Sequence, residues 1–290
     1  MKRMLITGIT GTLGRVVAVH ALAAGYAVHG TYRRELPVAS GPLDARPTTH
    51  QLDVADANAV NTLVDTLHPA VIVHTAAVLS GATLWQTNVE GTAHVAAAAQ
   101  RIGARLVHLS SDAIFAGGAA PYDEQARPRP VNLYGASKAA AEALVMAYLP
   151  TACVVRTSLL VNRDGSDQHS RMILAILNGE RAERLFEDEY RCPIAVEDVA
   201  AAVVELAGNS WAGILNVAGP DAVSRYELGR LVAAAHGRDP EAVPHTRLAD
   251  TSLAAVRPAD VRLDVTLAGR LLQTPLRGMR AYLEAPHETR

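Results

Sequence analysis

The chain has little cysteine and almost no lysine, and it lacks long apolar runs. Two cysteines, Cys153 and Cys192, are too few for a disulfide framework or a thiolate metal site. No apolar run approaches the roughly 20 residues of a membrane helix, and the first residues turn polar too early for a signal peptide. We therefore expect a soluble protein of the cytoplasm that holds no metal.

Neither sign of charge dominates. The formal net charge is −2, which argues against a protein that binds nucleic acid through a broad basic surface. Apolar residues make up 49% of the chain and charged residues 19%, so a large core can form and disorder is disfavoured. These numbers favour a small-molecule partner. The sequence leaves open whether the protein forms a homodimer, because no subunit interface can be identified from it.

Short β-branched runs alternate with alanine-rich stretches over the first half of the chain. The expected strands are 3–7, 26–32, 50–53, 70–74, 105–110 and 152–157, and the expected helices are 15–24, 55–67, 88–101 and 134–148. This order predicts βαβ units and an α/β fold with a doubly wound parallel Rossmann sheet.

The regular alternation of strands and helices ends after residue 157. Helices are expected at 171–177, at 196–206 and after the Ser224/Glu227 capping box, and one strand at 213–217. We expect a dinucleotide-binding domain over 1–157, completed by elements within 196–218. A smaller C-terminal α/β lobe, formed by 158–195 and 219–290, would bind the substrate.

Glycines 8, 11 and 14 lie between the first expected strand and the first helix. Glycine permits a tight turn and a close backbone approach, and the helix N-terminus offers N–H groups to a pyrophosphate. The GxxGxxG spacing at this junction therefore predicts a dinucleotide cofactor. The second strand ends at Arg33 and Arg34, and guanidinium matches the 2′-phosphate of NADP, so NADP is preferred and NAD stays open.

Tyr134 and Lys138 are four residues apart on an expected helix and share one face. A nearby ammonium favours phenolate and lowers the pKa of a tyrosine toward a range useful for proton transfer. Eight tyrosines and two lysines give about one chance in twenty of such a pair. Ser111 follows the preceding strand, where its hydroxyl can donate to a carbonyl oxygen that gains charge.

These residues resemble the extended short-chain dehydrogenases/reductases, and within them the dTDP-4-dehydrorhamnose reductase group. The resemblance covers nearly the whole chain. It rests on residues 8–14, 52–54, 74–77, 110–117, 134–138, 155–158 and 192–200, together with Arg257-Pro258 and Arg262-Leu263-Asp264.

The resemblance implies a reductase that transfers hydride to a keto group of a nucleotide-linked deoxysugar. Tyr134 would donate the proton, Lys138 would bind the nicotinamide ribose, and Ser111 would bond the carbonyl. The remaining cofactor contacts are implied for Gly8, Thr10, Gly11, Leu13 and Gly14 at the pyrophosphate, Asp53 and Val54 at the adenine, and Ala76 and Ala77 beneath the cofactor.

The chain departs from that group at the substrate side. Ala113 and Leu159 stand where the group commonly has aromatic residues, and the segment from 77 to 88 is shorter. Arg191 is expected to reach a nucleotide diphosphate. Two alternatives remain: an NAD-dependent nucleotide-sugar 4-epimerase, and a non-catalytic subunit similar to the methionine adenosyltransferase beta subunit. A 4,6-dehydratase is disfavoured, because no Asp-Glu pair follows Ser111.

Overall fold

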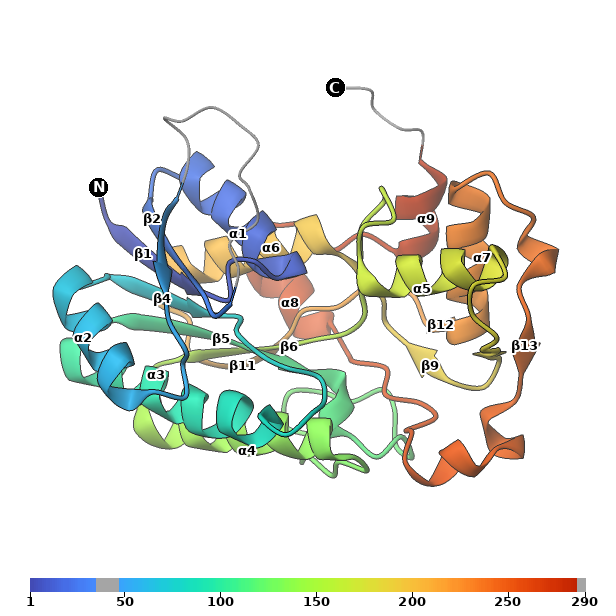
Figure 1. The fold of residues 1–290 in the computed structure, drawn as a ribbon, viewed down its shortest axis with the longest axis horizontal. Coiled ribbons are helices and arrows are strands. Elements are labelled where there is room, and N and C mark those ends of the chain that lie inside the picture. The colour runs from blue at the N-terminus through green and yellow to red at the C-terminus, as the bar shows by residue number, and fades with distance from the viewer. Residues whose placement is uncertain (35–46, 286–290) are drawn as a thin grey trace. The chain divides into compact units, whose positions relative to one another are not determined.

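The computed structural model describes residues 1–34 and 47–285, which divide into two compact units. Unit 1 comprises Met1–Ser111, Leu133–Arg156 and Ala200–Leu215, and unit 2 comprises Asp112–Asn132, Thr157–Val199 and Asn216–Arg290. The chain therefore crosses between the units several times (Figure 1).

A seven-stranded sheet forms the centre of unit 1. Its strands are β1 (Arg3–Thr7), β2 (Ala27–Tyr32), β3 (Thr48–Gln51), β4 (Val71–His74), β5 (Arg105–Ser111), β6 (Cys153–Thr157) and β11 (Gly213–Asn216). They follow the order β11-β6-β5-β4-β1-β2-β3, and β1 pairs in parallel with both β2 and β4. The strand order thus reverses beside β1, which is where open parallel sheets bind ligands.

Helices cover both faces of this sheet. Figure 1 shows α2 (Ala57–Leu67), α3 (Gly91–Ile102) and α4 (Leu133–Tyr148) on one face, and α1 (Thr12–Ala23) and α6 (Val196–Gly208) on the other. Local chemistry sets the helix ends: Asp56 caps α2 by accepting from the Ala59 N–H at 3.0 Å, and His68 ends it in a left-handed conformation with φ 41°.

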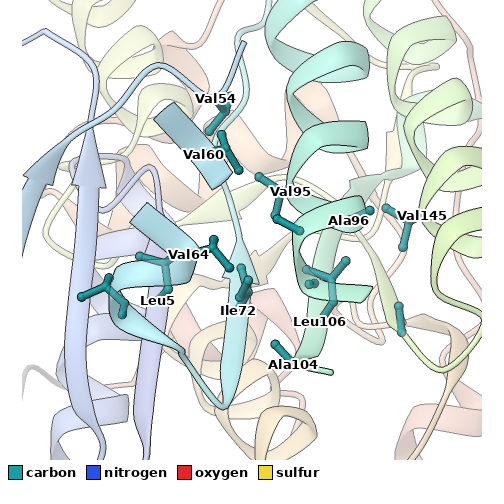
Figure 2. Packing of buried hydrophobic residues seen from close by; sticks show 14 of the residues in the cluster. Leu5, Val54, Val60, Val64, Ile72, Val95, Ala96, Ala104, Leu106 and Val145 are labelled. Atoms are coloured by element: carbon teal, nitrogen blue, oxygen red, sulfur yellow. The ribbon is translucent and has the colours of Figure 1, made fainter. Parts of the chain in front are cut away.

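A hydrophobic core of unit 1 lies between the sheet and helices α2 to α4. Leu5, Ile72 and Leu106 come from three neighbouring strands and pack with Val64 of α2 and Val95 of α3 (Figure 2). All four residues of β4 are buried, as expected for a central strand covered on both faces.

Unit 2 is built from short elements around a second core. Its two-residue strands pair as β7 (Leu160–Val161) with β10 (Ile194–Ala195), β9 (Tyr190–Arg191) with β12 (Val223–Ser224), and β8 (Leu185–Phe186) with β13 (His245–Thr246). Its helices include α5 (Gln168–Leu177), α7 (Arg225–Ala235), α8 (Thr266–Leu271) and α9 (Met279–Glu284). Ser224 caps α7 by accepting from the Glu227 N–H at 3.0 Å, as the sequence predicts.

The predicted α/β class with a doubly wound parallel sheet is confirmed. The expected helix 88–101 is helical throughout, but its first turn is π-helical: η2 (Gln86–Glu90) leads directly into α3, which begins at Gly91. Cys153 and Cys192 are free and buried, and burial raises the pKa of their thiols to about 12 and about 11. Within residues 1–34 and 47–285, the helices are all too short or too polar to cross a membrane.

Candidate active site

The glycine loop joins β1 to α1 in a conformation that needs glycine. Gly8 has φ +71°, and a Cβ there would lie 2.9 Å from Cα of Ala76. A Cβ on Gly14 would lie 2.4 Å from the carbonyl oxygen of Gly8. Helix α1 has no side-chain cap and no acidic residue in its first turn. Its first N–H groups and its positive end are therefore available to an anion.

A cavity in unit 1 opens at the carboxyl ends of β1, β2 and β4. It is lined by Gly8, Thr10, Gly11, Thr31, Tyr32, Arg33, Leu52, Asp53, Val54, Thr75, Ala76, Ala77, Val78 and Thr87. Eight of these lining residues are cofactor contacts expected from the sequence. Leu13, Gly14 and Arg34 do not line it.

The lining includes residues that the sequence reasoning missed. Thr87 comes from the turn η2 and accepts a hydrogen bond from Arg33 Nη1 at 3.4 Å. Val78 follows β4, and its backbone N–H and C=O both bond the side chain of Asn88 at 2.9 Å. No periodic pattern marks a π-helical turn, so the sequence carried no signal for these contacts.

Ser111, Tyr134 and Lys138 all belong to unit 1. Ser111 is the last residue of β5, Tyr134 and Lys138 lie on the first turns of α4, and α4 packs against β5. Between the last two, the Ser137 hydroxyl donates to the Tyr134 carbonyl at 2.7 Å and accepts from Asn88 Nδ2 at 2.9 Å. The start of α4 is thereby tied to the segment that lines the cavity.

Lys138 is 3% exposed. Burial lowers the pKa of its ammonium from 10.5 to about 8, and the carboxylate of Glu142 opposes that change. Glu142 is itself buried and is bound by Arg156 of β6 through Nη2 at 2.9 Å and Nε at 3.1 Å.

Two buried histidines accompany Lys138. His74 and His108 stack with ring centroids 5.3 Å apart, and His74 also bonds the hydroxyls of Thr7 and Thr92 at 2.7 and 3.0 Å. Burial and the charge of Lys138 lower the pKa of His74 to about 3 and that of His108 well below 6.5. Both rings are therefore neutral at pH 7 and belong to the core.

In unit 2, Arg191 is 7% exposed and its guanidinium is directed at protein groups. Its Nη2 lies 3.0 Å from Glu189 Oε1, and its Nη1 donates to the carbonyls of Tyr190 and Pro258 at 2.9 and 3.1 Å. These contacts occupy donors that the sequence analysis expected to reach a diphosphate.

Arg225 shares the partner Glu189 with Arg191 but makes fewer contacts through its guanidinium. Arg225 is 9% exposed, and its Nε lies 3.9 Å from Glu189 Oε1, outside hydrogen-bond distance. Across the described residues of unit 2, its guanidinium donates no hydrogen bond. Its guanidinium is charge-paired with Glu189 at 3.9 Å and keeps its N–H donors unused within the described residues, so it is suited to bind an anionic ligand.

Comparisons with known proteins agree with this organisation. Residues 1–288 match the RmlD substrate binding domain family. The chain belongs to that family. The resemblance stated from the sequence is confirmed, since the family covers nearly the whole chain and the motifs on which the resemblance rests.

Curated proteins with two different names are similar to this chain at equal identity. The chain is 30% identical over 296 residues to dTDP-4-dehydrorhamnose reductase of Mycolicibacterium smegmatis, covering 98% of this chain and 84% of that one. It is also 30% identical over 289 residues to methionine adenosyltransferase 2 subunit beta of Bos taurus, covering 91% and 80%.

Among solved structures, the fold is similar to dTDP-4-dehydrorhamnose reductase of Bacillus anthracis in complex with NADP. The TM-score is 0.82 at 24% identity, covering 98% of both chains. The enzyme WbmH of Bordetella bronchiseptica, in complex with NAD⁺, gives a TM-score of 0.79 at 23% identity, covering 98% and 96%. Both similarities show that this chain has the fold of these nicotinamide-cofactor complexes.

Proposed function

We propose that this chain is an NADPH-dependent reductase of a keto group on a nucleotide-linked deoxysugar, working in the cytoplasm. The observation that carries the proposal is the buried Lys138, one helical turn after Tyr134, in the same unit as the glycine-loop cavity. The similarity to dTDP-4-dehydrorhamnose reductases supports the substrate class. The two buried free thiols suit a reducing compartment.

The cavity residues fit a dinucleotide. Gly8, Thr10, Gly11, Leu13 and Gly14 would hold its pyrophosphate against the start of α1. Asp53 and Val54 would contact the adenine, and Ala76 and Ala77 the underside of the nicotinamide half. Arg33, with Arg34 beside it, would bind the 2′-phosphate that distinguishes NADP. When bound, the nicotinamide supplies the hydride.

The catalytic residues would handle the proton and the carbonyl oxygen. The Ser111 hydroxyl donates a hydrogen bond to the keto oxygen and stabilises the negative charge that develops there. The Tyr134 phenol gives its proton to that oxygen, so its O–H bond breaks as the new alcohol O–H forms. The Lys138 ammonium binds the ribose hydroxyls and stabilises the phenolate that remains.

We assign the substrate to unit 2. A nucleotide-linked sugar carries a diphosphate, and Arg225 offers a buried guanidinium that lacks a hydrogen-bond acceptor within the described residues. Arg191 lies in the same cluster through their shared partner Glu189. Leu159, where the group commonly has an aromatic residue, packs partly buried against the core of this unit.

The test is NADPH oxidation by the purified protein with a dTDP-4-keto-6-deoxyhexose. Tyr134→Phe removes the proton donor, so turnover should fall about 100-fold or more while NADPH binding persists. Tyr148→Phe is the matched control, because Tyr148 ends the same helix and is 38% exposed. Equal turnover in wild type and Tyr134→Phe would contradict the assignment.

A second candidate is a non-catalytic nucleotide-binding subunit. The observation that favours it is the 30% identity to methionine adenosyltransferase 2 subunit beta, equal to that for the reductase. This alternative predicts tight NADPH binding without oxidation for any keto sugar, and a biological activity that Tyr134→Phe leaves intact.

A further inference from the structure

Helix α4 buries a second ionisable residue one turn after Lys138. Glu142 is 4% exposed, and Lys138 is 3% exposed. Residues four apart on a helix are neighbours on one face. A carboxylate is rarely buried without a specific partner. The reaction proposed above uses Ser111, Tyr134 and Lys138 and leaves Glu142 without a role.

Arg156 fixes the orientation of this carboxylate. The guanidinium, 1% exposed, binds both carboxylate oxygens through Nη2 at 2.9 Å from Oε2 and Nε at 3.1 Å from Oε1. Such a forked contact holds a carboxylate in one plane. The Glu142 charge is thus held in place by Arg156 of β6, an interior strand that lies between β11 and β5 in the sheet.

The surroundings of Lys138 offer it little other stabilisation. From β4 and β5 it faces the imidazoles of His74 and His108, which are neutral because burial and Lys138 itself lower their pKa values. On its own helix it faces Tyr134 one turn earlier and Glu142 one turn later. Among these described neighbours, Glu142 is the carboxylate that favours the ammonium form.

We propose that Glu142, held by Arg156, is a positioning residue that keeps the buried Lys138 side chain protonated at neutral pH. Its link to catalysis rests on the proposed function, because a charged Lys138 is what stabilises the Tyr134 phenolate. The charge state of Lys138 itself does not depend on that function.

The sequence makes a direct test practical, because the chain contains only two lysines. Protein labelled with ¹³C at lysine Cε gives one signal from Lys138 and one from the exposed Lys2, which serves as an internal reference. In Glu142→Gln the shape of the side chain is kept and the charge is lost. The Lys138 titration midpoint should fall by about one pH unit or more, whereas that of Lys2 should not move.

Two further variants separate charge from packing. Glu142→Asp keeps the charge but shortens the side chain, so it should restore most of the Lys138 midpoint although it disturbs packing. Glu142→Gln combined with Arg156→Met removes both members of the buried ion pair, so that Arg156 is not left as an unpaired buried charge as it is in Glu142→Gln alone. The Lys138 midpoint should again lie below that of wild type.

The outcomes distinguish this proposal from the proposed function. An unchanged Lys138 midpoint in Glu142→Gln overturns the positioning role, even where the wild type reduces keto sugars. A lowered midpoint in a protein that oxidises no NADPH supports the positioning role and rejects the reductase. Where the positioning role and the reductase activity are both found, the decline of turnover at alkaline pH should begin at a lower pH in Glu142→Gln than in wild type. In Glu142→Asp it should begin near the wild-type pH.

Discussion

At the scale of single residues, Arg33 and Arg34 directly follow β2 and lie in different environments. Arg33 is partly buried, lines the cavity and donates to Thr87, whereas Arg34 is exposed and does not line it. The sequence predicts both arginines as 2′-phosphate ligands, and their positions favour Arg33 as the one that contributes more to phosphate binding.

The cofactor preference can be tested on this pair. Arg33→Met should weaken NADPH binding about 10-fold or more, because a hydrogen bond to a charged group contributes about 1.5–3 kcal/mol. Binding of NADH, which has no 2′-phosphate, should change little. The measurement is a fluorescence titration with each cofactor, and Arg34→Met is the matched control. Equal losses for NADPH and NADH would rule out 2′-phosphate recognition by Arg33.

At the scale of elements, the turn η2 connects the cavity to helix α4. Thr87 faces Arg33, and the next residue, Asn88, is fully buried and bonds both Val78 backbone groups and the Ser137 hydroxyl. π-Helical turns often occur at functional sites, where the extra residue re-aims side chains. Here the turn sends consecutive side chains to the cavity and to the helix that carries Lys138.

Asn88→Ala tests this connection. It removes three hydrogen bonds and leaves partly buried backbone groups of Val78 without their partner, so the free energy of unfolding should fall by about 2–4 kcal/mol. NADPH affinity should also fall, because Val78 lines the cavity. Ser137→Ala removes one of these three bonds and the bond to the Tyr134 carbonyl, but leaves both Val78 bonds intact, and should cost about 1–2 kcal/mol. Thermal unfolding with and without NADPH measures both effects, and an Asn88→Ala loss no larger than that of Ser137→Ala would contradict this role.

Strongly periodic elements could be predicted from the sequence, and short ones could not. The expected strand 3–7 matches β1, and the expected helix 134–148 differs from α4 by one residue. Strands of two residues, such as β9 and β12, show no period, and their pairing joins segments far apart in the chain. The glycine loop and Ser111 were readable because they lie at the carboxyl ends of strands, and Tyr134 and Lys138 because they are four residues apart on a helix. Glu142 was readable in principle, four residues after Lys138, whereas its pairing with Arg156 depends on the fold.

At the scale of the whole molecule, both units contain histidines whose pKa is lowered far enough to keep them neutral at pH 7. Burial lowers the pKa of His74 in unit 1 and of His169 in unit 2 to about 3, and that of His108 well below 6.5. In the unfolded chain such imidazoles take up protons near pH 6.5. Below that pH the unfolded state therefore binds more protons than the folded state, and the free energy of unfolding decreases with falling pH.

Acidification from pH 7 to pH 5 should lower the melting temperature. Each fully buried histidine should contribute about 2 kcal/mol over that range, from about 1.4 kcal/mol per pH unit below 6.5. His108→Leu should flatten the dependence without loss at pH 7, because both ring nitrogens of His108 are buried without a partner among the described residues. His20→Gln, at a partly exposed position on α1, is the control. Calorimetry across this pH range measures the slopes, and equal slopes in all three proteins would refute the effect.

The two buried thiols have a practical consequence for labelling. Thiolate is the form that attacks maleimides and iodoacetamides, and burial disfavours it at both Cys153 and Cys192. A cysteine introduced at an exposed position, such as Ala143 on α4, would therefore react alone while the native pair stays in place. Fluorophores or spin labels can thus be attached at a single chosen position without first building a cysteine-free variant.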